Sequence, residues 1–172
     1  MTYLTTAPGL PDILAPGLQV VFCGLNPGVD AAAAGHHFLG RGNRFWPVLH
    51  LAGFTPHLVA PQDDASVLGF GLGLTAAVGR PTSRADQVGA EEFAQAAGLL
   101  QKLACAQPQW IAFLGKAAYA AMTGKRQVDW GEQPERFGGA RVWIRPTPSG
   151  LNRGYSKERR VDAYAELRRA LS

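Results

Sequence analysis

Short apolar runs alternate with longer amphipathic stretches along most of this chain. Four runs contain β-branched or aromatic residues and end at a glycine or a turn, as buried strands do; they span residues 19–23, 72–78, 110–114 and 141–144. Apolar residues three and four positions apart predict helices over residues 43–53, 90–105, 116–122 and 156–171. Because strands and helices alternate, we predict an α/β fold with a parallel sheet and helices on both faces.

The helical periodicity also predicts which side chains face the core. The inward face of residues 90–105 consists of Phe93, Ala97, Leu100 and Leu103. The inward face of residues 156–171 consists of Val161, Tyr164, Leu167 and Leu171. The side chains predicted to face solvent are Arg159, Arg160, Arg168 and Arg169. Asn43 is expected to cap the first helix. Residues 29–42 are predicted to form a long, functional loop, and residues 124–139 a surface excursion.

The length and composition are those of a folded domain. A chain of 172 residues with 47% hydrophobic and 17% charged residues can build a core, so one domain over residues 1–172 is predicted. No apolar run reaches the roughly 20 residues of a membrane helix, and the first residues lack a basic signal-peptide head, so a cytoplasmic location is expected. The two cysteines, Cys23 and Cys105, are predicted to be small buried hydrophobes.

Positive charge is concentrated toward the end of the sequence. The net charge is +4, but residues from Arg141 onward contribute +5 and the first 140 residues sum to −1. A basic segment suits a polyanionic partner such as nucleic acid, and a solvated helix face explains it as well. The charge alone leaves both interpretations open.

A loop directly after the first predicted strand places an amide between two tight turns. Its sequence is Gly24-Leu25-Asn26-Pro27-Gly28. In a parallel sheet the loops that follow the strands gather at one edge, where α/β proteins bind ligands. Asn-Pro-Gly also shapes turns that have no further role. The position after a buried strand favours a ligand-binding role for Asn26.

A second loop, residues 148–153, presents an apolar side chain among small and polar ones. Leu151 is poorly explained as core, although it can be an incidental residue of a proline-glycine turn. As a wedge between base steps it would offset unstacking that costs roughly a few kcal/mol. Ser149 and Arg153 could then grip phosphates, and Asn152 could read a base edge. A polar and an apolar loop on one rim suit an enzyme that extrudes a base from DNA.

Three further features carry weaker signals. Phe38 can stack on an extruded base or fold back onto the core. The four histidines lack metal-ligand spacing, so no metal is expected. Gly115-Lys116 resembles the tail of a phosphate-binding loop, but the full Walker pattern is absent, and Lys116 is expected to pack its stem or to touch DNA phosphate.

Seven short blocks of this sequence resemble the mismatch-specific (double-stranded) uracil-DNA glycosylases of the thymine/uracil DNA glycosylase family. They follow the family order over nearly the whole chain: residues 12–18, 20–28, 43–46, 52–55, 80–82, 114–116 and 148–151, with Arg153. The resemblance implies a three-layer α/β/α sandwich. It also implies a monofunctional DNA N-glycosylase that flips uracil or a related base out of a mismatch with guanine, hydrolyses the N-glycosidic bond and leaves an abasic site. Double-stranded DNA is the expected partner, with no cofactor; a monomer associated with the nucleoid is expected.

The resemblance also implies roles for individual residues. Asn26 would position the water that attacks C1′ of the flipped nucleotide, and Leu151 would be the intercalating wedge. Gly150 and Asn152 would face the widowed guanine. The expected base pocket consists of Gly24, Leu25, Pro27, Gly28, Ala31, Phe38 and Ala76, and the expected phosphate contacts are Ser149, Arg153 and Lys116.

The sequence departs from the family pattern around Asn26 and before the wedge. Thr147 replaces a usual asparagine, Gly79 an acid, Ala76 a lysine and Ala31 a frequent serine. The pocket is therefore expected to accept different bases, to use another acid such as Asp30 or Asp86, or to be weakly active. A protein that binds mismatched or damaged duplex without catalysis is the alternative, and phosphate-ester chemistry at Lys116 is a remote third.

Overall fold

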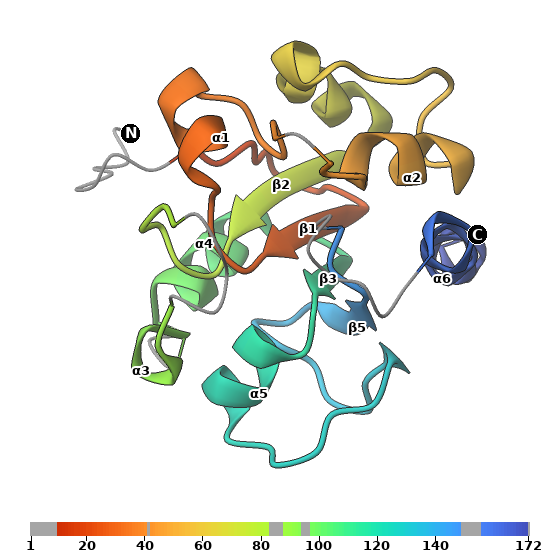
Figure 1. Cartoon of the computed structure of the whole chain (residues 1–172). Helices are drawn as coiled ribbons and strands as arrows, with labels where there is room; N and C mark the ends of the chain where they lie inside the picture. The colour runs from red at the N-terminus through yellow and green to blue at the C-terminus, as the bar shows by residue number, and fades with distance from the viewer. Residues whose placement is uncertain (1–9, 41, 83–87, 94–96, 149–155, 172) are drawn as a thin grey trace.

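The computed structural model describes residues 10–40, 42–82, 88–93, 97–148 and 156–171 (Figure 1). Its centre is a sheet with the strand order β2-β1-β3-β5-β4. The strands are β1 (Val20–Gly24), β2 (Leu72–Ala76), β3 (Trp110–Leu114), β4 (Gly131–Glu132) and β5 (Arg141–Arg145). The pairs β2-β1, β1-β3 and β3-β5 are parallel, and β4 runs antiparallel to β5. The predicted α/β class with a mostly parallel sheet is confirmed.

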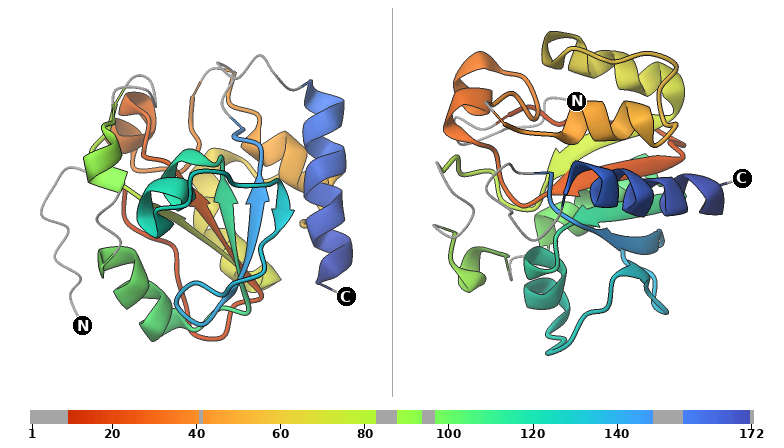
Figure 2. Two further views of the ribbon diagram at one scale, coloured as in Figure 1. Left: turned by 90° about the horizontal axis from the view of Figure 1, so that it is seen from below. Right: turned by 45° about the vertical axis from the view of Figure 1, so that its right-hand side comes forward.

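One face of the sheet is covered by α2 (Phe45–Leu51), the 3-10 helix η1 (Pro61–Phe70) and α6 (Lys157–Ala170). Figure 2 shows α6 running beside α2 on this face. Phe22 of β1 is fully buried at the centre of this layer. Its ring centroid lies 5.5 Å from that of Phe45, 5.3 Å from that of Phe54 and 6.4 Å from that of Tyr164. Aromatic burial of this kind dominates core energetics.

The opposite face is covered by α4 (Ala97–Ala106) and α5 (Ala117–Thr123), with α3 (Ala90–Phe93) beside α5. Leu99 and Leu103 of α4 are buried against the sheet, and Tyr119 of α5 packs on Phe113 with ring centroids 5.3 Å apart. Helices on both faces explain why every residue of β1 and β3 is buried. Within the described residues, no helix combines the length and apolar character needed to cross a membrane.

The segments predicted to be irregular contain regular structure. Residues 29–42 begin with the helix α1 (Val29–Ala34), which ends at Gly35 in the left-handed conformation. A run of four alanines has high helix propensity, so the prediction of a continuous loop there was wrong. Residues 124–139 include β4, whose two residues are too few to show a strand period.

The burial predicted for four residues was also wrong. On α4 the buried face is Leu99, Leu103 and Ala106, whereas Ala97 and Leu100 are exposed. Arg160 is buried because its guanidinium reaches a loop carbonyl, which periodicity along α6 cannot predict. Cys105 is exposed, while Cys23 is buried as predicted. The burial of these four side chains depends on tertiary contacts and not on the local pattern.

Candidate functional site

The loops after β1 and β2 run side by side beyond the carboxyl edge of the sheet. The amide of Ala77 donates to the carbonyl of Gly24 at 2.9 Å, and the amide of Val78 to that of Leu25 at 3.1 Å. A further bridge joins Gly28 to Thr82. The two loops therefore form one continuous backbone unit, and a side chain on the first is held by the second.

Asn26 is the side chain that this unit fixes. Its Nδ2 donates to the carbonyl of Arg80 at 2.9 Å and to Thr82 Oγ1 at 2.8 Å, and lies 3.3 Å from the carbonyl of Pro27. A carbonyl oxygen can only accept, so these contacts fix which end of the amide is nitrogen. Oδ1 points away from them, and within the described part of the chain it accepts no hydrogen bond. The arrangement leaves Asn26 with a positioned acceptor.

Phe38 lies over the start of the same loop. A Cβ atom on Gly24 would stand 3.6 Å from the Cε1 and Cζ atoms of Phe38, so glycine there lets the ring approach the backbone. The Phe38 ring stacks on Phe45 with centroids 3.9 Å apart and planes 19° from parallel. The ring is only partly buried. Phe38 therefore packs on the core, which is one of the two predicted alternatives, and part of its ring remains accessible beside the Asn26 loop.

The backbone before Phe38 is held by several polar contacts. The His37 amide donates to Asp64 Oδ2 at 2.8 Å, and Trp46 Nε1 donates to the His37 carbonyl at 3.1 Å. His37 Nε2 lies 2.8 Å from the carbonyl of Pro11, while burial lowers the pKa of this histidine. Phe38 itself has φ of +56°, a conformation that is costly for an aromatic residue. The contacts of His37 hold the backbone that leads into this conformation and so position the Phe38 ring.

A hollow of about 470 Å³ opens beside Phe38. Asp30 of α1 and Asn43 line it together with Phe38, and the remaining lining is largely apolar: Leu39, Gly40, Trp46, Pro47, Leu58, Val59, Ala60 and Pro61. Asn43 Oδ1 accepts from the amide of Phe45, the first residue of α2, at 2.9 Å, but the N-cap position is Arg44 and not Asn43 as predicted. Asp30 is exposed in the first turn of α1. The hollow therefore lies between Phe38 and an acid of α1.

The other predicted pocket residues differ in burial and position. Ala31 is buried in α1, and Ala76 ends β2 opposite Gly24. Pro27 is buried in the turn and Gly28 is exposed. The Leu25 side chain packs on the α5 side, where a Cβ on Gly115 would lie 3.6 Å from its Cδ2. Leu25 thus contributes its backbone to the loop unit and its side chain to the opposite core.

The segment that leads from β5 to the predicted wedge is held at each of its carbonyl groups. The carbonyl of Arg145 accepts from the Gly115 amide at 2.7 Å. The next carbonyls accept in turn from α6 and from the residue before α2: Pro146 from Tyr164 Oη at 2.9 Å, Thr147 from Arg160 Nε at 3.2 Å and Pro148 from the Arg44 amide at 3.0 Å. The predicted wedge and phosphate residues Ser149, Gly150, Leu151, Asn152 and Arg153 lie outside the described residues, as does Asp86.

Lys116 follows β3 at the same edge. Gly115 has φ of +108°, so the chain turns sharply between β3 and α5. The Lys116 ammonium lies 4.5 Å from the ring centroid of Trp130, a cation–π contact. The lysine is partly buried. Its ammonium therefore contacts Trp130 at the edge shared with the Asn26 loop.

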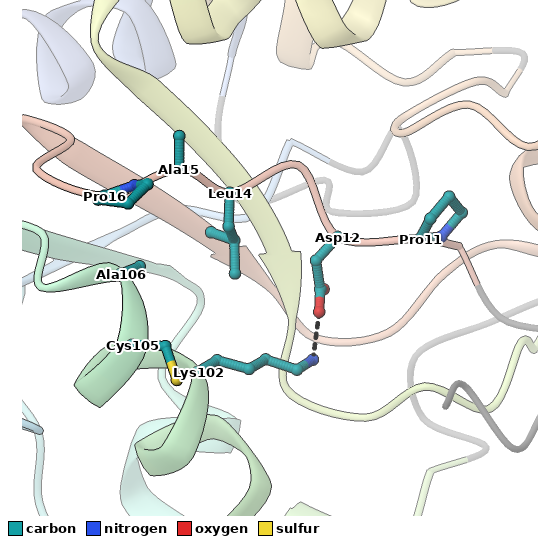
Figure 3. A pocket seen from close by; sticks show the side chains of 8 residues that line it. All are labelled: Pro11, Asp12, Leu14, Ala15, Pro16, Lys102, Cys105 and Ala106. Atoms are coloured by element: carbon teal, nitrogen blue, oxygen red, sulfur yellow. Dashed lines mark ion pairs between the residues drawn. The ribbon is translucent and has the colours of Figure 1, made fainter. Parts of the chain in front are cut away.

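A second hollow, of about 260 Å³, lies between the N-terminal segment and α4 (Figure 3). In it Lys102 Nζ pairs with Asp12 Oδ2 at 2.8 Å, and Thr75 Oγ1 donates to Asp12 Oδ1 at 2.6 Å. Cys105 also lines it. Burial raises the pKa of the neighbouring Cys23 to about 12, so that thiol stays protonated. The paired charges tie the N-terminal segment to α4.

Two polar residues near Asn26 and Phe38 were not identified as site residues from the sequence. They are Thr82 and Asp64. Thr82 belongs to a block with family resemblance, but only the structure shows it bonded to Asn26. The signal was available, because Thr82 follows the strand predicted over residues 72–78. Asp64 has no comparable signal, since it lies in an unpredicted 3-10 helix. Among the described residues, no group of three His, Cys, Asp or Glu side chains is arranged to hold a metal ion.

Known proteins resemble this chain in sequence pattern and in fold. A family model described as the uracil DNA glycosylase superfamily matches residues 11–171. The solution NMR structure of a protein from Methanosarcina acetivorans, described as a candidate uracil DNA glycosylase, superposes with a TM-score of 0.62 at 24% sequence identity. The alignment covers 95% of this chain and 96% of that one. At this identity the structural match establishes a shared fold.

Proposed function

Since the chain belongs to the uracil DNA glycosylase superfamily, we propose that it is a monofunctional DNA glycosylase of the mismatch-specific type, which removes uracil or a related base opposite guanine. Membership in the superfamily supports an enzyme that hydrolyses N-glycosidic bonds in DNA. The observation that carries the proposal is the Asn26 amide, held by Arg80 and Thr82 so that Oδ1 remains available. An amide oxygen at this edge can orient a water molecule but cannot take its proton fully.

In the proposed reaction uracil departs as an anion, so the attacking water needs no strong proton acceptor. The bond between C1′ and the uracil nitrogen breaks and its electron pair leaves with the uracil anion, while the oxygen of the water forms a new bond to C1′. The water's proton passes to solvent or to the departing anion. Backbone N–H groups of the loop 24–28, except Pro27, which has none, would stabilise that anion. Catalysis would thus depend on positioning and electrostatics, and we expect slow turnover.

The flipped base would lie against Phe38. The ring is fixed on one face by Phe45 and is partly accessible. Stacking on an aromatic side chain stabilises an unpaired base by about 1–3 kcal/mol. The proposed pocket wall is Gly24, Pro27, Gly28, Ala31 and Ala76, with the backbone of Leu25. Asp30 is the candidate acid in place of the one missing at Gly79, because it lines the hollow beside Phe38.

The base would be extruded by the loop after β5. Leu151 would fill the vacated stack, Gly150 and Asn152 would face the guanine, and Ser149, Arg153 and Lys116 would contact phosphates. Support comes from the leading segment, because successive carbonyls from Arg145 to Pro148 are held by hydrogen bonds. A wedge must resist the force of restacking, so a rigid support suits it.

The test is a panel of duplexes that carry uracil, thymine, ethenocytosine or hypoxanthine opposite guanine or adenine, incubated with excess enzyme and cleaved with alkali at abasic sites. We expect the fastest release from uracil opposite guanine. Equal rates for uracil opposite guanine and opposite adenine would contradict the mismatch preference. No release from any duplex, combined with selective mismatch binding, would instead favour the alternative of a non-catalytic reader, which the departures at Thr147, Gly79 and Ala76 motivate.

Replacing the wedge should slow base release in a way that depends on stacking. We expect Leu151→Ala to reduce the rate of uracil release from duplex DNA about 10-fold. The alanine side chain would no longer fill the vacated stack and offset unstacking, which costs roughly a few kcal/mol. Release from single-stranded uracil DNA should change less than about 3-fold, since no stack has to be opened. Single-turnover rates on both substrates provide the measurement, and equal losses on the two would argue against a wedge.

A further inference from the structure

Trp130 is the largest exposed apolar side chain at the carboxyl edge of the sheet. It is 41% exposed, whereas Trp46 and Trp110 are buried. An exposed tryptophan suits a binding surface, because its indole combines a large apolar face with a polar N–H group. The cation–π contact with Lys116 covers part of the ring without hiding it.

The sheet register places Trp130 beside the start of the wedge segment. Gly131 pairs with Ile144 in the antiparallel β4-β5 ladder, so the preceding Trp130 lies next to Arg145 at the end of β5. A Cβ on Gly131 would stand 3.6 Å from the Arg145 guanidinium, which shows how closely the two chains approach. Along the edge the order is therefore the Asn26 loop after β1, Lys116 after β3, the wedge segment after β5 and Trp130 before β4.

The turn that carries Trp130 is held by a buried amide. Gln133 is 7% exposed, and its Nε2 donates to the carbonyl of Asp129 at 2.8 Å and to that of Gly131 at 3.1 Å. These carbonyls lie on either side of Trp130 in the sequence. The exposure of the indole is therefore built into the fold, with the turn fixed before any partner arrives.

We infer that Trp130, with the ammonium of Lys116, forms a second DNA contact, to the strand opposite the extruded base. The inference rests on the proposed function, which seats the flipped nucleotide at Asn26. Trp130 lies on the far side of the wedge segment, three strand positions from β1, or about 14 Å at the usual strand spacing. The lysine would pair with a phosphate, and the indole would pack on the adjoining sugar or base. Such contacts fix the duplex without reading its sequence.

The inference is tested by binding rather than by catalysis. The probes are a duplex with a tetrahydrofuran abasic analogue opposite guanine and the corresponding single strand, measured by fluorescence anisotropy. We expect Trp130→Ala to weaken duplex binding about 10-fold, in line with the loss of one stacking contact, and to change single-strand binding less than about 2-fold. Trp130→Phe should retain most of the affinity. Leu51→Ala, which truncates another exposed apolar side chain, on the last residue of α2, should bind like the wild type.

Two outcomes would overturn the inference: duplex binding by Trp130→Ala equal to that of the wild type, or equal losses on duplex and single strand. Photocrosslinking of 5-iododeoxycytidine, placed in each strand in turn, assigns the strand. Adducts at Trp130 are expected from the strand opposite the abasic analogue, and adducts from the other strand alone would refute the assignment. Uracil release is scored separately. If the wild type releases uracil and Trp130→Ala binds duplex like the wild type, this inference alone is refuted. If Trp130→Ala selectively loses duplex binding but the wild type releases no base, the proposed function alone is refuted.

Discussion

Replacing Asn26 by alanine should reduce uracil release by at least about 100-fold while the protein stays folded. Loss of one preorganised polar group at a reacting centre typically costs a factor of 10² to 10³ in rate. Here the amide would hold the attacking water through Oδ1, and its orientation is fixed by the Arg80 carbonyl. Single-turnover release from a duplex with uracil opposite guanine gives the rate, and a melting temperature checks the fold. A rate within about 3-fold of the wild type would remove Asn26 from the mechanism.

The neighbouring Thr82 offers a matched pair of variants. Its Oγ1 accepts from Asn26 Nδ2 at 2.8 Å and is part of what holds the amide. Thr82→Val removes the hydroxyl at nearly constant volume, and we expect about 10-fold slower release because the amide is less well positioned. Thr82→Ser keeps the hydroxyl and should behave like the wild type. If both variants lost activity equally, the effect would come from packing around Thr82 and not from the hydrogen bond.

The largest expected effect on stability comes from Phe22→Ala in β1. Phe22 is fully buried and its ring contacts those of Phe45, Phe54 and Tyr164, which belong to α2, the loop after it and α6. Truncating a buried phenylalanine costs about 3–5 kcal/mol, from lost transfer free energy and the cavity left behind. Urea unfolding should show this as a lower free energy of unfolding.

Leu51→Ala is the control for that experiment. Leu51 is apolar and lies on α2, but it is 55% exposed, so its truncation should change the free energy of unfolding by less than about 0.5 kcal/mol. Because Phe45 also stacks on Phe38, we expect Phe22→Ala, which loosens the aromatic layer, to lower the rate of uracil release as well. A Phe22→Ala protein as stable as Leu51→Ala would show that the aromatic layer is not the main support of β1.

Several parts of the molecule were predictable because their signal is local. The third strand occupies the predicted residues, Trp110–Leu114, since a short apolar run after a proline needs no distant information. Ser156 caps α6 by accepting from the Arg159 amide, and Asn43 accepts from the first amide of α2. The conformational and capping preferences of residues adjacent in the sequence decide such features. The same holds for Asn26, whose loop was recognised from its position after a strand.

Other features were unpredictable because they depend on which segments the fold brings together. Arg160 is buried since α6 lies beside the segment that leaves β5, and a periodicity along α6 alone places it in solvent. On α4 the buried face is shifted by one residue, from Leu100 to Leu99. Helical periodicity defines a stripe, but the neighbouring helices decide its centre.

Residue type and spacing alone predict the alternation of strands and helices, the family resemblance and the presence of an amide and a leucine in two strand-end loops. Those properties reside in spacing and residue type over a few positions. The tertiary structure decided that Thr82 holds Asn26 across 56 residues of sequence and that Phe38 lies on Phe45. It also placed Trp130 next to the wedge segment. These relations follow from the strand order β2-β1-β3-β5-β4, which is set by how the two helical layers pack and not by any local pattern.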